Sequence, residues 1–211
     1  MTITPLQRAE YSNKKWRELQ QEYANALWMW ANIEAQIFII YASALGMSGK
    51  DVQPLRSAFF SINSFEMRLT MTHAAVKTQW GEESQAFILW GELRKKCDKA
   101  NRKRGKIAHK IGMCYSTPNN LIFALTDPLW HTNHLDWRKA KAEGINAETL
   151  KQYAAEWNDL DAMLINFGLV LWNGEPLPTS LSQLADQSRP PLHINVLNPK
   201  VPESPPESFQ E

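Results

Sequence analysis

The sequence has few cysteines and no long apolar run, and these two shortages exclude whole classes of protein. Cys97 and Cys114 are the only cysteines among 211 residues, so there is no disulfide framework, and their spacing matches no zinc pattern. The most apolar stretch, Ala35 to Met47, is too short to span a bilayer. The first residues also lack the apolar core of a signal peptide. These features predict a reduced, cytoplasmic protein with no membrane partner.

The sequence also has little overall charge, but what charge it has is unevenly distributed. The net charge is +1. Residues 94–110 contain nine Lys or Arg residues and one acid, Asp98, which gives this segment a charge of +8. The other residues carry −7, from 14 basic and 21 acidic side chains. Positive charge concentrated in one segment predicts a surface that holds a phosphate-bearing partner.

The pattern of apolar residues predicts an all-α fold. A content of 44% apolar and 21% charged residues is typical of a globular protein. Apolar residues at three- and four-residue steps predict four helices, over about 5–45, 52–79, 82–105 and 146–173. We therefore expect a bundle of four to five helices in which two or more long helices are antiparallel.

Two segments interrupt the helical pattern. Residues 113–125 contain two short apolar runs around a Pro- and Asn-containing turn, which predicts a small β-hairpin after the third helix. Residues 174–211 hold eight of the twelve prolines, which predicts a Pro-rich tail or linker. The expected division is a helical domain at 1–173 and this tail at 174–211.

The best candidate for chemistry is the pair Arg104 and His109. An arginine can grip a phosphate or stabilise its developing charge, and a histidine can move a proton near neutral pH. In an unbroken helix, however, a five-residue step turns by about 140°, so the two side chains would diverge unless the helix breaks at Gly105. Arg102, seven residues before His109, would share its face. The alternative is a cationic helix end favoured by the helix dipole, with one histidine at a junction.

The segment Arg104-Gly105-Lys106-Ile107-Ala108-His109 resembles the signature of the HEPN superfamily. That signature is an arginine, four to six residues and a histidine, often written Arg-Asn-x-x-Ala-His. The order of the predicted elements is similar as well, with long helices before the motif, a hairpin after it and a final amphipathic helix. The similarity covers residues 16–173. The sequence departs from the usual pattern at Gly105, where the family has Asn, Asp or another polar residue that helps to position the site.

The resemblance implies a homodimer in which two motifs meet in a cleft that cuts RNA without a metal or other cofactor. It implies catalytic roles for Arg104 and His109, with Glu34 on the first helix as an acid that meets the motif arginine. Glu66 has a similar but weaker claim. Many family members act as toxins or in phage defence, which would imply an antitoxin or another protein partner. The residues expected to bind RNA are the neighbouring cations Lys99, Arg102, Lys103, Lys106 and Lys110.

Other interpretations remain open from the sequence. The chain can be a non-catalytic HEPN-like module that binds RNA or a protein, or a structural oligomerisation protein whose cations are a solvated face. His131 and His134 are spaced as a metal pair, but no further ligand completes a recognisable set, so a polar loop is the better interpretation. Base stacking on Trp130 or Trp137 is a further alternative to packing in the core.

Overall fold

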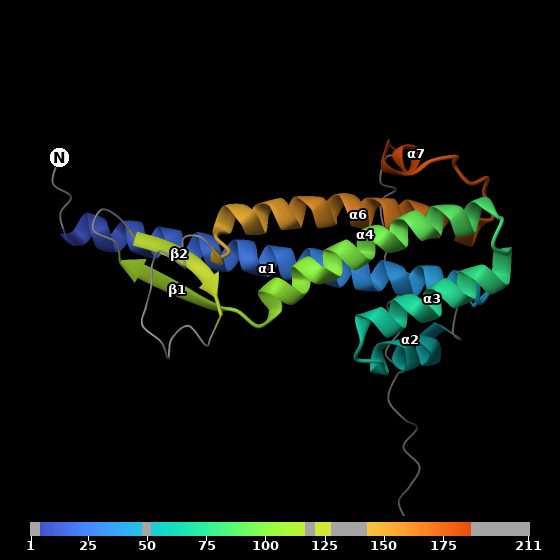
Figure 1. Cartoon of the computed structure of the whole chain (residues 1–211), viewed down its shortest axis with the longest axis horizontal. Coiled ribbons are helices and arrows are strands. Elements are labelled where there is room, and N and C mark those ends of the chain that lie inside the picture. Colours follow the sequence, from blue (N-terminus) through green and yellow to red (C-terminus); the bar gives the residue numbers. More distant parts are fainter. Residues whose placement is uncertain (1–4, 48–51, 117–120, 128–142, 187–211) are drawn as a thin grey trace, which may run out of the picture.

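The computed structural model describes residues 5–47, 52–116, 121–127 and 143–186. Within them it has six helices and one two-stranded antiparallel sheet, so the predicted all-α bundle with a small hairpin is confirmed. The bundle is built from α1, α3, α4 and α6, while α2 and α7 are short helices at its surface (Figure 1). No helix of the described residues is long and apolar enough to cross a membrane.

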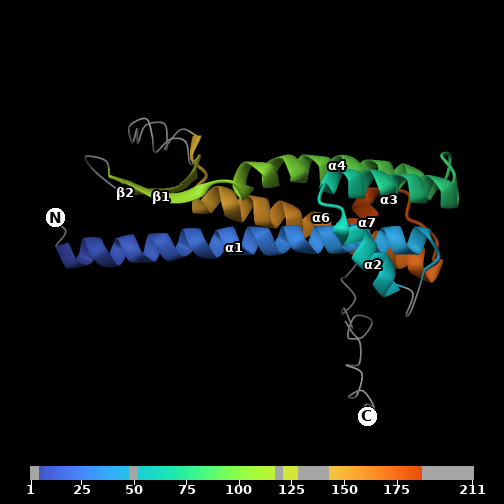
Figure 2. The same ribbon diagram turned by 90° about the horizontal axis from the view of Figure 1, so that it is seen from below.

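Helix α1 (Pro5–Ala44) runs the length of the molecule (Figure 2). Its buried residues recur at three- and four-residue steps and form one continuous stripe, which includes Ala26, Trp30, Ile33, Ile37 and Ile40. The helix ends just before Gly46, whose φ of 64° lies in the left-handed region that suits glycine. The hairpin covers the N-terminal half of α1, and α2 and α3 pack at its C-terminal half (Figure 2).

The predicted helix over 52–79 is wrong, because the chain forms two helices there, α2 (Val52–Ser61) and α3 (Phe65–Trp80). Ser64 caps α3: its backbone is extended and its hydroxyl accepts a hydrogen bond from the Met67 N–H at 3.3 Å. Capping by serine competes with continuation of the helix. The break turns the chain so that both Phe59 and Phe65 are buried.

Helix α4 (Gln85–Ala108) carries the basic segment. It begins three residues later than predicted, at a cap made by Ser84, whose side chain accepts a hydrogen bond from the Phe87 N–H. The helix continues without a break through Gly105 and ends at His109, which has φ −114° and ψ 11°. Ile107, after the glycine, is fully buried, and its burial fixes the last turn to the bundle.

The hairpin consists of β1 (Ile111–Ser116) and β2 (Leu121–Thr126), with Ile111 opposite Thr126. It packs on α1 at Trp16, whose ring lies 6.3 Å from that of Phe123. Gly112 lies directly against the same indole, and a Cβ there would come within 2.8 Å of it. Aromatic packing therefore anchors the hairpin to the N-terminal half of the long helix.

Helix α6 (Ala147–Asn173) is the second long helix of the bundle. Asn146 caps its start and Gly174, in the left-handed region, ends it, as the sequence predicts. It runs in the same direction as α1 and antiparallel to α4 (Figure 1). Two ion pairs show how α6 is aligned with its neighbours. Lys151 of α6 contacts Glu18 of α1, and Glu156 of α6 contacts Lys103 near the end of α4.

Helix α7 (Leu181–Asp186) packs on the bundle within the segment predicted as tail. Leu184 is fully buried, and its carbonyl accepts a hydrogen bond from the Asn166 side chain at 2.7 Å. Gln85 of α4 donates to the Pro178 and Thr179 carbonyls. The boundary predicted at residue 173 therefore lies before the last element that packs on the bundle.

Candidate functional site

Five basic side chains lie along one face of α4. Their positions in the chain differ by four, three, four and three residues, which places them within an arc of about 80° on an α-helix and over a length of about 21 Å. All five are exposed. We call this set the cationic stripe: Lys95, Lys99, Arg102, Lys106 and His109.

The three lysines, the arginine and the histidine of this stripe are not used to hold the fold together. Among the described residues, none of the five side chains forms an ion pair or a side-chain hydrogen bond. Cations left unpaired in a row produce a continuous positive potential. Lys95 was not among the RNA-binding residues predicted from the sequence, although the alternating four- and three-residue steps from Lys95 to His109 are visible there.

Lys103, which was predicted to bind RNA, has a different role. Its amine donates to Glu156 Oε2 on α6 and lies 4.8 Å from the centre of the Tyr153 ring. Its side chain is only 19% exposed. Lys103 therefore joins α4 to α6. Lys110 follows the helix end and is half-buried.

Arg104 lies on the opposite side of α4 from the stripe. Its side chain is half-buried, and its Nε is buried without a hydrogen-bond partner among the described residues. Because α4 is unbroken at Gly105, Arg104 and His109 are separated by about 140° around the helix. The break that would bring them together in one chain does not occur, whereas Arg102 and His109 do share a face.

Glu34 does not meet Arg104. Its Oε1 accepts a hydrogen bond from Arg68 of α3 at 2.7 Å, and no hydrogen bond or ion pair of the described residues joins it to α4. Arg68 is buried and Glu34 is half-buried, so the pair is part of the bundle interior. Glu66 is exposed in the first turn of α3, where an acid suits the positive end of the helix dipole.

His109 is the member of the motif that solvent can reach. It stands at the C-terminal cap of α4, just before the hairpin, and its imidazole has no hydrogen-bond partner among the described residues. An exposed imidazole at the end of a cationic stripe can exchange a proton with a bound phosphodiester or its ribose. The cation that shares this face of α4 with His109 is Arg102.

The other reactive side chains among the described residues give no second candidate site for catalysis or metal binding. Burial raises the pKa of the Cys97 thiol far above its ordinary value, and burial also raises the pKa of Cys114. Neither thiol is therefore activated as a nucleophile. Within the part of the chain that the structure describes, no three His, Cys, Asp or Glu side chains gather as metal ligands. His131, His134, Trp130 and Trp137 lie outside it.

No protein-family model matches the sequence, and neither a curated protein nor a solved structure gives a significant match. The similarity to the HEPN signature therefore depends on residues 104–109 and on the order of the helices around them.

Proposed function

We propose that this chain is a HEPN-like protein that binds single-stranded RNA along the cationic stripe. The observation that carries the proposal is the row of exposed, unpaired cations on one face of α4. Successive members are separated along the helix axis by about 4.5 to 6 Å, so a flexible phosphate backbone can follow them. Neutralising each phosphate releases a condensed counterion, which supplies sequence-independent affinity.

The proposal is tested with two double variants of equal charge change. Lys99→Gln/Arg102→Gln removes two cations of the stripe, and Lys14→Gln/Arg17→Gln removes two exposed cations of α1. Anisotropy of a labelled RNA oligonucleotide should show at least ~10-fold weaker binding for the first variant and little change for the second. Equal losses in both variants would mean that only net charge matters, and the proposal would fail.

A second candidate function is metal-independent RNA cleavage by two copies of the chain. It is favoured by the exposed His109 and by Arg104, whose buried Nε has no partner. The two side chains diverge within one chain, so a composite site needs Arg104 of one copy and His109 of another. His109 would accept the proton of a ribose 2′-hydroxyl, whose oxygen attacks the adjacent phosphorus. The bond to the 5′-oxygen then breaks, the departing oxygen takes up a proton, and a 2′,3′-cyclic phosphate remains.

Mixing two inactive variants tests whether such a site is shared between chains. Arg104→Ala and His109→Ala should each fail to cut RNA in EDTA. After mixing and exchange of subunits, a dimer that contains one chain of each kind retains one intact composite site, so about a quarter of the wild-type rate should return. Wild-type cleavage that His109→Ala does not reduce would rule out this mechanism. Absence of rescue would rule out a site composed of Arg104 from one copy and His109 from another.

A further inference from the structure

A groove with a volume of about 610 Å³ lies between α4 and α6, next to the cationic stripe. Helix α7 forms its end wall through Leu181, Ser182 and Ala185. Its size is within the usual range for pockets that hold small organic groups. Lys99 belongs both to the groove and to the stripe, so a strand that follows the stripe passes the mouth of the groove.

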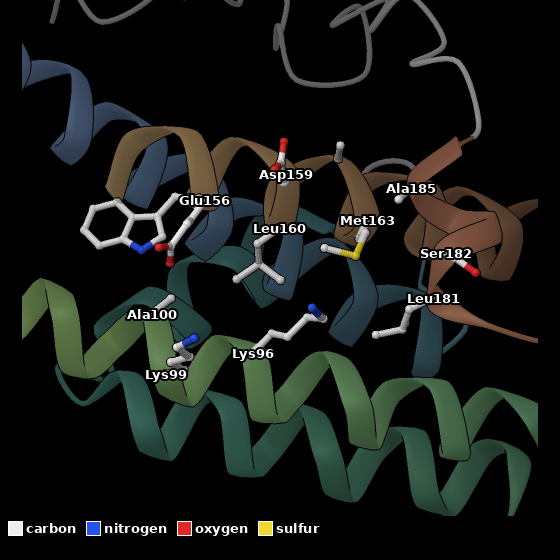
Figure 3. A pocket seen from close by; sticks show the side chains of 12 residues that line it. Lys96, Lys99, Ala100, Glu156, Asp159, Leu160, Met163, Leu181, Ser182 and Ala185 are labelled. Atoms are coloured by element: carbon white, nitrogen blue, oxygen red, sulfur yellow. The ribbon is translucent and has the colours of Figure 1, made fainter. Parts of the chain in front are cut away.

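The α4 wall of the groove is basic. Lys96 and Lys99 extend from α4, and Lys96 reaches towards α6 (Figure 3). Among the described residues neither lysine has an ion-pair partner. Their ammonium groups are therefore available to a phosphate at the mouth of the groove.

The opposite wall supplies a carboxylate. Glu156 points from α6 towards α4, whereas Asp159, one turn further along, points away from α4 (Figure 3). Glu156 Oε2 accepts a hydrogen bond from Lys103, and Oε1 accepts none from the described residues. The groove therefore holds one carboxylate oxygen that no described residue occupies.

The surface between these walls is apolar. It is formed by Ala100 of α4, Leu160 and Met163 of α6, and Leu181 of α7. A mostly apolar cavity with a few polar groups at its rim suits a flat group with apolar faces and a polar edge. A nucleobase has this character, and proteins that read single-stranded RNA take up unstacked bases in such sites.

We infer that the groove receives one unstacked base of the RNA strand that the cationic stripe binds, and that it prefers cytosine to uracil. This inference rests on the proposed RNA binding. Lys96 and Lys99 contact the phosphate of that nucleotide, and the base lies on Leu160 and Met163. Glu156 Oε1 accepts a hydrogen bond from the exocyclic amine at position 4 of cytosine. Uracil has a carbonyl oxygen at the same position, which repels the carboxylate.

The test compares labelled hexamers of cytidine and uridine, which differ only at this position and one neighbouring ring nitrogen. Wild-type protein should bind the cytidine hexamer roughly five-fold more tightly, a modest ratio because the groove is open to water. Glu156→Gln should bind both hexamers about equally, because an amide can donate to uracil as well as accept from cytosine. Retained folding is checked from the unfolding midpoint of each variant.

Two control variants separate this contact from general charge. Asp159→Asn removes the neighbouring acid that points away from α4, and Lys103→Gln removes the ion pair but keeps the Glu156 carboxylate. Both should keep the preference for cytidine. Equal binding of the two hexamers by wild-type protein, or a preference that survives Glu156→Gln, would overturn the inference and leave the proposed function standing. If neither hexamer binds, the proposed function itself fails.

Discussion

Glu34 and Arg68 form an ion pair of 2.7 Å between α1 and α3 inside the bundle. The Arg68 guanidinium also lies over the rings of Phe59 and Phe60, at 5.9 and 5.4 Å from their centres. These contacts connect three helices, because the two phenylalanines belong to α2. Glu34, which the resemblance to the HEPN signature predicts to meet the motif arginine, instead neutralises an arginine that fixes the corner between α2 and α3.

Removing the acid of this pair should destabilise the protein more than removing the base. Glu34→Ala leaves the buried Arg68 charge unpaired, which should lower the free energy of unfolding by about 2 kcal/mol. Arg68→Met replaces the guanidinium by an apolar chain of similar length and leaves a carboxylate that water can reach. It should therefore lower the free energy of unfolding by less than Glu34→Ala does. Urea denaturation of the two variants measures the order. A larger loss for Arg68→Met would contradict this account, and Lys15→Ala, in a partly exposed pair with Glu18, should change stability little.

Replacing Gly105 should stabilise the protein, because this glycine lies inside an unbroken helix. A Cβ at this position meets no atom within 4 Å, and alanine loses less backbone entropy than glycine on folding into a helix. Gly105→Ala should therefore raise the free energy of unfolding by about 0.5 to 1 kcal/mol, which calorimetry or urea titration detects. A loss of stability would indicate that the helix is in fact strained at this point.

Gly112→Ala provides the opposite case within the same region. Its Cβ would come within 2.8 Å of the Trp16 indole, so either the ring or the β1 strand must move. We expect a loss of about 1 to 3 kcal/mol in unfolding free energy, together with a change in tryptophan fluorescence. Unchanged stability would mean that the hairpin is not seated on α1.

Much of the fold follows from the sequence because long amphipathic helices leave a strong signal. The ranges of α1 and α6 are close to the predicted ones, since apolar periodicity and end signals such as Asn146 and Gly174 agree there. The break between α2 and α3 is not visible in the same way. Phe59, Ile62 and Phe65 continue the three-residue spacing across it, and only the capping by Ser64 distinguishes two helices from one.

The features of the site are also of two kinds: some follow from local sequence, and others depend on tertiary packing. The stripe is local, because positions on one helix fix which cations share a face. The partner of Glu34 is tertiary, because the choice between Arg68 and Arg104 depends on which helix packs beside α1. The continuity of α4 at Gly105 is tertiary too, since the buried Ile107 holds the last turn in place against the weak helix preference of glycine.

His73 should make stability depend on pH near neutrality. It is half-buried against Phe87, with ring centres 4.9 Å apart. Burial, followed by the charges of Arg94 and Lys77, lowers the pKa of His73 below its ordinary value of 6.5, and Glu82 opposes this only weakly. The unfolded chain therefore takes up this proton at higher pH than the folded chain does. The contribution of His73 to the free energy of unfolding is fully present above pH 6.5. It is lost as the pH falls from 6.5 towards the pKa of His73 in the folded protein.

The measurement is the urea midpoint between pH 7.5 and 5.5. The wild-type midpoint should fall over this range, and His73→Gln should show a smaller fall. The pKa values of Glu18 and Glu82 are lowered by lysine contacts. Their contributions to stability are lost only below pH 4.5, so they do not affect the urea midpoint over this pH range. An equal fall in His73→Gln would show that other groups cause the pH dependence.

Leu184→Ala should destabilise the whole bundle and not α7 alone. Leu184 is fully buried in the core cluster, so its truncation should lower the free energy of unfolding by about 2 to 3 kcal/mol. Ser182→Ala, an exposed change on the same short helix, is the control. If only the hydrogen exchange of α7 increases while the global midpoint stays constant, the helix is a loosely attached appendage and the packed unit ends near residue 173.

The salt dependence of RNA binding should distinguish Lys95 from Lys103, two lysines on the same helix. Lys95 is exposed in the stripe, whereas the Lys103 ammonium is held by Glu156 and lies over the Tyr153 ring. Each phosphate contact to single-stranded RNA contributes about −0.7 to the slope of log K against log salt concentration. Lys95→Gln should therefore make the slope shallower by about 0.7, and Lys103→Gln should leave it unchanged. Because both variants remove one positive charge, a slope that changes equally in both would show that binding responds to net charge and not to the arrangement of the stripe.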